Sequence, residues 1–369
     1  MAASNLADWI SAISQLLFLL IFVLLFLGVN QRFQVYVWSR DIKAKLTLID
    51  SMAVEARKKT LDFMNKNRAR DAKKLLDRIT DFFVISPVQL EPTDIIRRLQ
   101  HLLDVRRRRF KEEFEKAMPE ADEYTRSRAE TASEIAAALT FIYKYVRHLL
   151  IMGEKTRNWI LIMQLQLIMP QIIKIADMYR KALDDFLMGT PIGDSAGPMV
   201  AVRLAGFDAG WKEIDEETVY AVSEVENRKV YVIKAKGPGS NVGKPGVATA
   251  KLIEELVKNG EKPSLIITVD AALKLEGEET GSIADGVGAA IGDPGPEKIS
   301  FERIAAHYNI PLRAVIVKMG MEEAIQAIKK EIADAVDKAV ERVKEIIVSE
   351  TKEGDSVVVI GVGNTIGVI

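Results

Sequence analysis

An aspartate at the end of a β-branched run is the first residue suited to chemistry. Asp270 directly follows residues 265–269, which read as a buried strand. In a parallel sheet, ligands and reacting groups gather where strands end, so a carboxylate there is suited to metal binding or proton transfer. The small-residue loop 280–295 follows and carries two more carboxylates, Asp285 and Asp293. The candidate catalytic acids are therefore Asp270 with Asp285 or Asp293.

A glycine-rich loop between an expected strand and an expected helix is the second candidate. Its expected ligand-binding residues are Gly237, Gly239, Ser240, Asn241, Gly243 and Lys244. Such a loop directs backbone N–H groups at an anion or a carboxylate. It does not match a nucleotide-binding P-loop, because Pro238 replaces the first glycine and Pro245 replaces the magnesium-binding hydroxyl. The competing interpretation is a tight turn that holds the strand against the helix.

Two further segments carry candidate binding residues. The last expected strand, 357–362, runs into Gly363 and Asn364, which should lie at the same rim. Four consecutive arginines, Arg106, Arg107, Arg108 and Arg109, form a pattern that could hold lipid phosphates or RNA. Because Lys111, Glu112, Glu113, Glu115 and Lys116 follow directly, the competing interpretation is a solvated helix face with local ion pairs.

The overall composition limits the chemistry further. The 51 basic and 52 acidic residues give a net charge of -1, so there is no strong nucleic-acid signal. The absence of cysteine removes disulfides, thiolate nucleophiles and cysteine metal sites. His101, His148 and His307 are not spaced as ligands, so no metal site is expected, and the sequence leaves any cofactor unknown. Many Lys, Glu and Arg residues without Cys also fit a thermophile.

An uncharged apolar run near the N-terminus predicts a membrane anchor. Residues 10–29 contain no charge, and twenty residues at about 1.5 Å each span roughly 30 Å, the thickness of a hydrocarbon core. A cleaved signal peptide fits less well, because no Lys or Arg precedes the run. Arg32, Arg40, Lys43 and Lys45 follow it, so the positive-inside bias places the body in the cytoplasm. We expect a single-pass protein of the cell membrane.

The next region reads as helix almost throughout. Apolar residues recur at helical spacing from residue 30 to about 188, which predicts an all-α bundle. Helices at 128–152 and 155–188 should form an antiparallel pair around Gly153. The apolar stretch 159–173 is interrupted by glutamines and Pro170, so a buried bundle helix is favoured over a membrane-dipping segment. A helix apolar on all sides must be enclosed, which predicts a homo-oligomer.

Composition changes again at residues 189–198, where glycine and proline predict an interdomain linker. Beyond it, β-branched runs alternate with helical segments, which indicates a mostly parallel sheet covered on both faces. The expected strands are 200–204, 230–234, 265–269, 314–318 and 357–362, and the expected helices are 246–259, 300–308 and 321–349. The expected domains are an anchor at 1–31, a helical domain at 32–188, the linker at 189–198 and an α/β domain at 199–369.

Two resemblances accompany these patterns. From Met1 onward the chain resembles an uncharacterised archaeal membrane-protein family known mainly as a domain of unknown function, which implies no activity. Residues 230–330 resemble the phosphorylase/hydrolase-like fold of hydrogenase-maturation proteases and the spore germination protease. The strand, glycine loop and helix over 230–256, the pair Asp270-Ala271 and the segment 286–295 follow in the order of that fold. It implies Asp270 as a catalytic or metal-binding acid, whereas Asn241 and Lys244 stand where the first loop would carry the other acid.

These observations lead to hypotheses from different classes. The leading one is a membrane-anchored, self-assembling scaffold whose α/β domain binds a partner or a small ligand. The alternative is a membrane-tethered hydrolase or peptidase that uses Asp270 at the glycine-rich rim. A third is binding of RNA or lipid phosphates through the four arginines.

Overall fold

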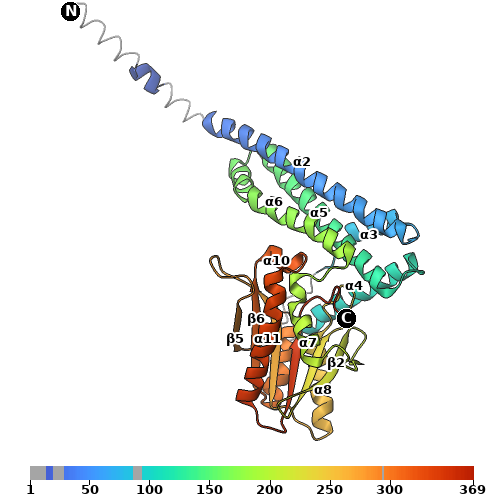
Figure 1. Cartoon of the computed structure of the whole chain (residues 1–369). Helices are drawn as coiled ribbons and strands as arrows, with labels where there is room; N and C mark the ends of the chain where they lie inside the picture. The colour runs from blue at the N-terminus through green and yellow to red at the C-terminus, as the bar shows by residue number, and fades with distance from the viewer. Residues whose placement is uncertain (1–13, 20–28, 86–93, 293–294) are drawn as a thin grey trace, which may run out of the picture. The chain divides into compact units, whose positions relative to one another are not determined.

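The computed structural model describes residues 14–19, 29–85, 94–292 and 295–369 (Figure 1). The chain divides into two compact units. The first unit comprises the chain up to Glu55 together with Ala138–Asp177, and the second comprises Ala56–Ala137 with Met178–Ile369. Three long helices contribute to both units, namely α2 (Val29–Lys66), α5 (Glu123–Thr156) and α6 (Trp159–Met188).

The first unit is a bundle of the N-terminal part of α2, the C-terminal part of α5 and the first part of α6. Only Arg157 and Asn158 separate α5 from α6, and Arg157 has the positive φ of 51° that reverses the chain. The predicted helix pair is present, but its turn is at residues 157 and 158, and Gly153 lies inside α5. Side chains at helical spacing on each helix fill the core; they include Ile42, Ile49, Val146, Leu150, Ile162, Leu165 and Met169.

Helix α6 is buried on one face only within its unit. Ile162, Leu165 and Met169 are fully enclosed, at spacings of three and four residues. Ile160 and Ile168 are exposed, and Leu167 is 71% exposed. The prediction that this stretch is a buried bundle helix therefore holds for one face, and the opposite face carries apolar side chains that the described residues do not cover.

The predicted membrane anchor lies mostly outside the described residues. Residues 14–19 of the run form helix, and their side chains are exposed. Among the described helices, α5 and α6 are long and apolar enough to cross a membrane by length and composition. These two helices differ from the single span that the sequence predicts.

The second unit begins with a small helical cluster. The end of α2, α3 (Ala72–Thr80), α4 (Ile95–Ala117) and the start of α5 pack around apolar side chains that include Met64, Leu75, Ile79, Phe110, Phe114 and Met118. The all-α prediction for this region is confirmed. Phe110 and Phe114 lie on the same face of α4, one turn apart, which directs the intervening arginines away from the core.

A seven-stranded mixed sheet forms the centre of the second unit (Figure 1). The strands are β1 (Lys212–Glu213), β2 (Thr218–Val225), β3 (Arg228–Ala235), β4 (Leu265–Leu273), β5 (Ile283–Val287), β6 (Leu312–Met319) and β7 (Ser356–Gly361). Their order is β1-β2-β3-β7-β4-β6-β5. The central strands β3, β7, β4 and β6 are parallel, as predicted, and the outer strands pair antiparallel.

Helices cover both faces of the sheet. α7 (Ala196–Ala205) and α11 (Lys330–Glu350) bury one apolar cluster, and α8 (Pro245–Lys258) and α9 (Pro296–Tyr308) bury the other. The predicted long helix at 321–349 is divided into the short α10 (Met321–Ile325) and α11. This layered arrangement places the ends of the parallel strands and the glycine-rich loops at one rim.

One predicted strand is wrong. Residues 200–204 belong to α7, where Val200, Ala201 and Leu204 face the sheet at helical spacing. The β-branched residues favoured a strand, but tertiary packing overrides this weak preference. Gly197 allows the close approach, since a Cβ there would lie 2.1 Å from the carbonyl oxygen of Val362.

The segment expected as a linker, residues 189–198, packs into the second unit. Ile192 is bridged to Ala327, and Gly193–Ser195 form a 3-10 turn that continues into α7. Ser195 and Ala196 are fully buried. This segment thereby brings Asp194 close to the ends of the central strands.

Candidate functional site

A cavity of about 590 Å³ lies within the second unit, between α4, the start of α5 and the glycine-rich loop. The predicted site residues that line it are Arg106, Arg107, Gly237, Gly239, Ser240, Asn241 and Asn364. The arginine run and the glycine-rich loop, which the sequence offered as separate sites, therefore meet at one place. Gly243, Lys244, Gly363, Arg108 and Arg109 are not among the lining residues.

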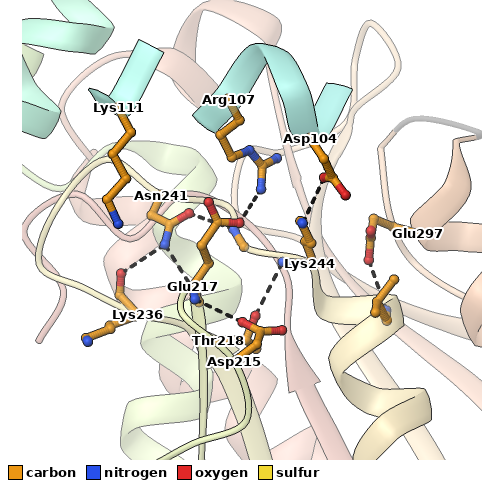
Figure 2. Close-up of polar contacts among 12 residues, drawn as sticks. Asp104, Arg107, Lys111, Asp215, Glu217, Thr218, Lys236, Asn241, Lys244 and Glu297 are labelled. Atoms are coloured by element: carbon orange, nitrogen blue, oxygen red, sulfur yellow. Dashed lines mark hydrogen bonds and ion pairs between the residues drawn. The ribbon is translucent and has the colours of Figure 1, made fainter. Parts of the chain in front are cut away.

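Ion pairs hold α4 over the glycine-rich loop and the start of β2. Figure 2 shows Asp104, Arg107 and Lys111 directed from α4 toward the loop. Arg107 donates to the carboxylate of Glu217, and Lys244 Nζ lies 2.8 Å from Asp104 Oδ1. These groups are partly shielded from water, which makes the pairs stronger than exposed ones. They fix one wall of the cavity.

The loop itself is held by side-chain and backbone hydrogen bonds. Asn241 Nδ2 donates to the carbonyl of Glu217 at 3.2 Å, and Asn241 Oδ1 accepts from the N–H of Gly243 at 2.9 Å (Figure 2). Asn364 Nδ2 donates to Ser240 Oγ at 3.0 Å. Gly237 passes the C-terminus closely, since a Cβ there would lie 1.8 Å from the carbonyl oxygen of Val368. The turn interpretation therefore accounts for Asn241 and Gly243.

The predicted anion position at the start of α8 is filled by the protein itself. Glu297 Oε2 accepts hydrogen bonds from the N–H groups of Gly246 at 2.8 Å and Val247 at 3.1 Å (Figure 2). Burial raises the pKa of Glu297, and these two hydrogen bonds oppose that shift. The N-terminus of α8 thus binds an internal carboxylate, which is the group that its unpaired N–H donors favour.

Two glutamates on α5 dominate the electrostatics of the cavity. Burial raises the pKa of Glu130 to about 7; the negative charge of Glu134 adds to the shift, while Arg107 and Arg106 oppose it. Burial also raises the pKa of Glu134, although Glu134 Oε1 lies 2.7 Å from Arg106 Nη2. A carboxyl group that titrates near neutral pH is a feature of functional sites.

Glu130 differs from its neighbours because it has no hydrogen bond or ion pair within the described parts of the chain. The sequence reasoning missed it. The available signal is a polar stripe on one face of α5, formed by Ser127, Glu130, Thr131 and Glu134 at spacings of three, one and three residues. Alanines such as Ala129, Ala132 and Ala136 occupy the buried face of the same helix.

Asp270 does not follow the strand as predicted: it lies inside β4, one residue after the pairing with β7 ends and three residues before the end of the strand, and it is 4% exposed. Its Oδ1 accepts from the N–H of Ala271 at 2.8 Å. Burial raises the pKa of Asp270 well above its usual value, and the charge of Asp194 adds to the shift. Asp194 Oδ2 accepts from the N–H of Asn364 at 2.8 Å, and burial raises the pKa of Asp194 as well. The sequence reasoning missed Asp194 because it lies in the segment expected as a linker.

The predicted pairing of Asp270 with Asp285 is wrong. Asp270 is opposite Ile316 and Asp285 is opposite Val315, so the two carboxylates point to opposite faces of the sheet. Asp285 pairs instead with Arg313 at 3.1 Å and Arg342 at 2.6 Å. Asp293 lies outside the described residues.

The remaining predicted residues do not line the cavity. Arg108 and Arg109 are exposed, and neither has an ion pair among the residues that the structure describes. Gly363 has a φ of 132°, and a Cβ there would lie 2.0 Å from the carbonyl oxygen of Asp194. No cluster of three or more His, Asp or Glu side chains that could hold a metal ion occurs in the described ranges.

Comparison with known proteins gives a family without an activity. Residues 16–189 match "Protein of unknown function (DUF1512) N-terminal domain", and residues 192–369 match "Domain of unknown function (DUF1512) C-terminal". The chain belongs to the DUF1512 family. The boundary between the two family domains falls at Thr190 and Pro191, within the segment that joins α6 to the sheet of the second unit.

Similarity to other proteins is weak. A crystal structure of a proteasome-assembly chaperone homologue from Mycobacterium tuberculosis matches with 13% sequence identity and a TM-score of 0.32. That match covers 45% of this chain and 84% of the other. No curated protein matches the chain.

Replacing Asp270 by Asn should stabilise the protein at neutral pH. The folded state raises the pKa of Asp270, so its ionisation costs stability as the pH rises above the unfolded value near 4. Asn does not ionise, and its Oδ1 can still accept from Ala271. We expect equal stability below pH 4 and a gain of about 1–3 kcal/mol at pH 7, measured by urea unfolding.

Asp285→Asn is the matched control, because it removes charge from a carboxylate paired with Arg313 and Arg342. It should lower the free energy of unfolding at pH 7. A loss of stability in Asp270→Asn at pH 7 would contradict the assignment of Asp270 as a destabilised buried carboxylate.

Proposed function

We propose that this protein is a membrane-anchored binding protein whose cavity between α4, α5 and the glycine-rich loop takes a small ligand with an amino or guanidino group. The observation that carries the proposal is Glu130, an unpartnered carboxylate at the wall of a cavity of about 590 Å³. That volume is in the range of small-molecule pockets. The glycine-rich loop supplies backbone groups on the opposite side.

The charges of the cavity favour a cationic ligand. Arg106 and Arg107 are paired with Glu134 and Glu217, so their charge is already compensated. Six acidic and five basic side chains line the cavity in total, which leaves a small negative excess. A ligand cation beside Glu130 would satisfy a carboxylate that is shielded from water and that the described protein groups leave unbonded, and it would reduce the cost of its burial.

The anchoring part of the proposal rests on residues 10–29. Their uncharged length suits one span, and the basic residues that follow favour a cytoplasmic body. A binding protein of this design would sense or present its ligand at the inner face of the cell membrane. A scaffold could bind this ligand as well, because neither assembly nor ligand binding requires a catalytic group.

The cavity proposal predicts proton-linked binding. A cationic ligand prefers ionised Glu130, so its affinity should rise as the pH increases from 6 to 8 and level off above the pKa of about 7. Glu130→Gln should abolish this pH dependence and weaken binding about tenfold to a hundredfold, because a hydrogen bond to a charged group contributes about 1.5–3 kcal/mol. The measurement is calorimetric titration with putrescine, spermidine and arginine at each pH.

Two variants control this experiment. Glu353→Gln changes an exposed glutamate outside the cavity and should bind as wild type. Thr131→Trp fills the cavity beside Glu130 and should abolish binding without loss of secondary structure. Affinity that rises toward low pH instead would indicate an anionic ligand and would refute the cation assignment.

A hydrolase or peptidase is the second candidate, favoured by Asp194 beside Asp270. Burial raises the pKa of both carboxyl groups, and the charge of Asp194 raises that of Asp270 further, which is an arrangement used for acid and base chemistry. Asp194 here supplies the second acid that the first loop lacks. The sealed surroundings of Asp270, which is 4% exposed, weigh against access by a peptide.

This second candidate predicts peptide cleavage that Asp270→Asn removes. The assay is a peptide library incubated with wild-type protein, with and without divalent metals, and with Asp270→Asn and Asp194→Asn at matched concentration. A true activity should fall by at least about 100-fold in both variants while their melting temperatures do not fall. Absence of cleavage by wild type under all conditions would eliminate the hydrolase.

Self-assembly is the remaining part of the functional proposal. Leu167 and Ile168 on the uncovered face of α6 supply apolar area for a second copy. We predict that wild type sediments as an oligomer in mild detergent and that Leu167→Lys with Ile168→Lys sediments as a monomer with an unchanged helical circular dichroism signal. Replacing the buried Leu165 would instead unfold the bundle. A monomeric wild type would remove the scaffold role.

A further inference from the structure

The end of the first unit where α5 turns into α6 carries an exposed apolar surface. We call it the tip and define it by Phe33, Tyr36, Val37, Ile151, Met152 and Ile160. Phe33 and Tyr36 are each 66% exposed. Such a cluster on one end of a small bundle is unusual for a surface that only contacts water.

Contacts inside the first unit bring the two halves of the tip together. Gln166 Nε2 donates to Asp41 Oδ2 at 2.6 Å, and Lys43 Nζ lies 2.7 Å from Glu154 Oε1. Gly153 packs against Ile162, where a Cβ would lie 2.5 Å from Ile162 Cδ1. The ends of α5 and α6 that meet at the turn therefore lie beside Asp41 and Lys43, about three turns into α2.

The charges around the tip are predominantly basic. Arg40, Lys155 and Arg157 are exposed and have no ion pair among the described residues. The nearby acids are neutralised, since Asp41 pairs with Lys45 at 2.6 Å and Glu154 pairs with Lys43. Exposed aromatic and aliphatic side chains flanked by free basic groups form the composition of an interfacial membrane contact.

The position of the tip along the chain identifies its partner. The uncharged run 10–29 ends where α2 begins at Val29. At about 1.5 Å per helical residue, Phe33 and Tyr36 lie within about 11 Å of that point. A bilayer that holds the run therefore places its headgroup region beside these side chains.

We propose that the tip is a second membrane contact: its apolar side chains enter the interface, and Arg40, Lys155 and Arg157 bind anionic lipid headgroups. This inference rests on the anchoring part of the proposed function. Attachment at both the anchor and the α5–α6 turn would fix the orientation of the three-helix bundle on the membrane. The ligand at the tip is a lipid phosphate, since its negative charge complements the positive charges of Arg40, Lys155 and Arg157.

The absence of cysteine from the chain makes the test direct. Thr156→Cys places a single thiol in the exposed turn, and Glu353→Cys places one on an exposed loop of the second unit. Each full-length variant is labelled with an environment-sensitive fluorophore and reconstituted into vesicles of phosphatidylcholine alone or with phosphatidylglycerol. Flotation of the vesicles is measured on the same samples.

The label at 156 should shift to shorter wavelength in vesicles, and the shift should be larger with phosphatidylglycerol. Lys155→Glu with Arg157→Glu should remove the phosphatidylglycerol-dependent part, whereas Lys352→Glu, an exposed control in the second unit, should not. The label at 353 should show no shift. Circular dichroism of the variants checks that the helices are retained.

The outcomes separate the tip from the anchor. Flotation without any shift at 156 overturns the tip and leaves the anchor in place. Failure to float overturns the anchor and, with it, the tip. The fluorescence shift at 156 could instead depend on the number of protein molecules per vesicle and not on lipid composition. That result would assign the tip to a contact with a second copy of the chain and would overturn the lipid contact.

Discussion

The ion pairs between α4 and the sheet are the interactions on which the arrangement of the candidate site depends. Arg107 with Glu217 and Asp104 with Lys244 join a helix to a loop and strand that follow it by more than a hundred residues. Partly buried charges are costly when one partner is lost, so these pairs resist separation more than their net contribution to stability suggests. They hold α4 against the loop, and the cavity lies between them.

The sequence predicted which segments form the site, but it did not predict which residues pair with one another there. The strand–loop–helix pattern and the arginine run both lie at the cavity, because glycine and charge reveal loops and solvated faces locally. The partner groups are distant in sequence: Glu217 for Arg107, Asp104 for Lys244 and Glu297 for the N-terminus of α8. Each donor could be identified from its own segment, but its acceptor depends on the tertiary fold.

The same limit explains the fold-level results. The central parallel strands and the helices that flank them were predictable, since period and length are properties of each segment. The strand predicted at residues 200–204 is wrong because Gly197 permits a helix to approach the sheet closely, which is a tertiary effect. Asp194 could not be paired with Asp270 from sequence, because the turn that carries it looked like a flexible connection. The edge strands β1 and β5 were also missed, since short edge strands have weak patterns, and the longer antiparallel strand β2 was missed with them.

Asp270 and Glu130 both have raised pKa values, but their surroundings differ. This difference favours a ligand-binding role for Glu130 and a structural role for Asp270. Asp270 is enclosed, accepts a hydrogen bond from Ala271 and lies near enough to Asp194 for that charge to raise its pKa. Burial disfavours the charged form of Asp270, and its surroundings are closed to solvent, so an added ligand would gain little there. Glu130 borders open space with its carboxylate unbonded by the described residues, while nearby arginines partly favour its charge. A ligand cation would shift the proton equilibrium of Glu130 near neutral pH, where a small free energy changes its ionisation most. A raised pKa therefore indicates a binding site only where a cavity accompanies it, and within the described residues Glu130 meets both conditions.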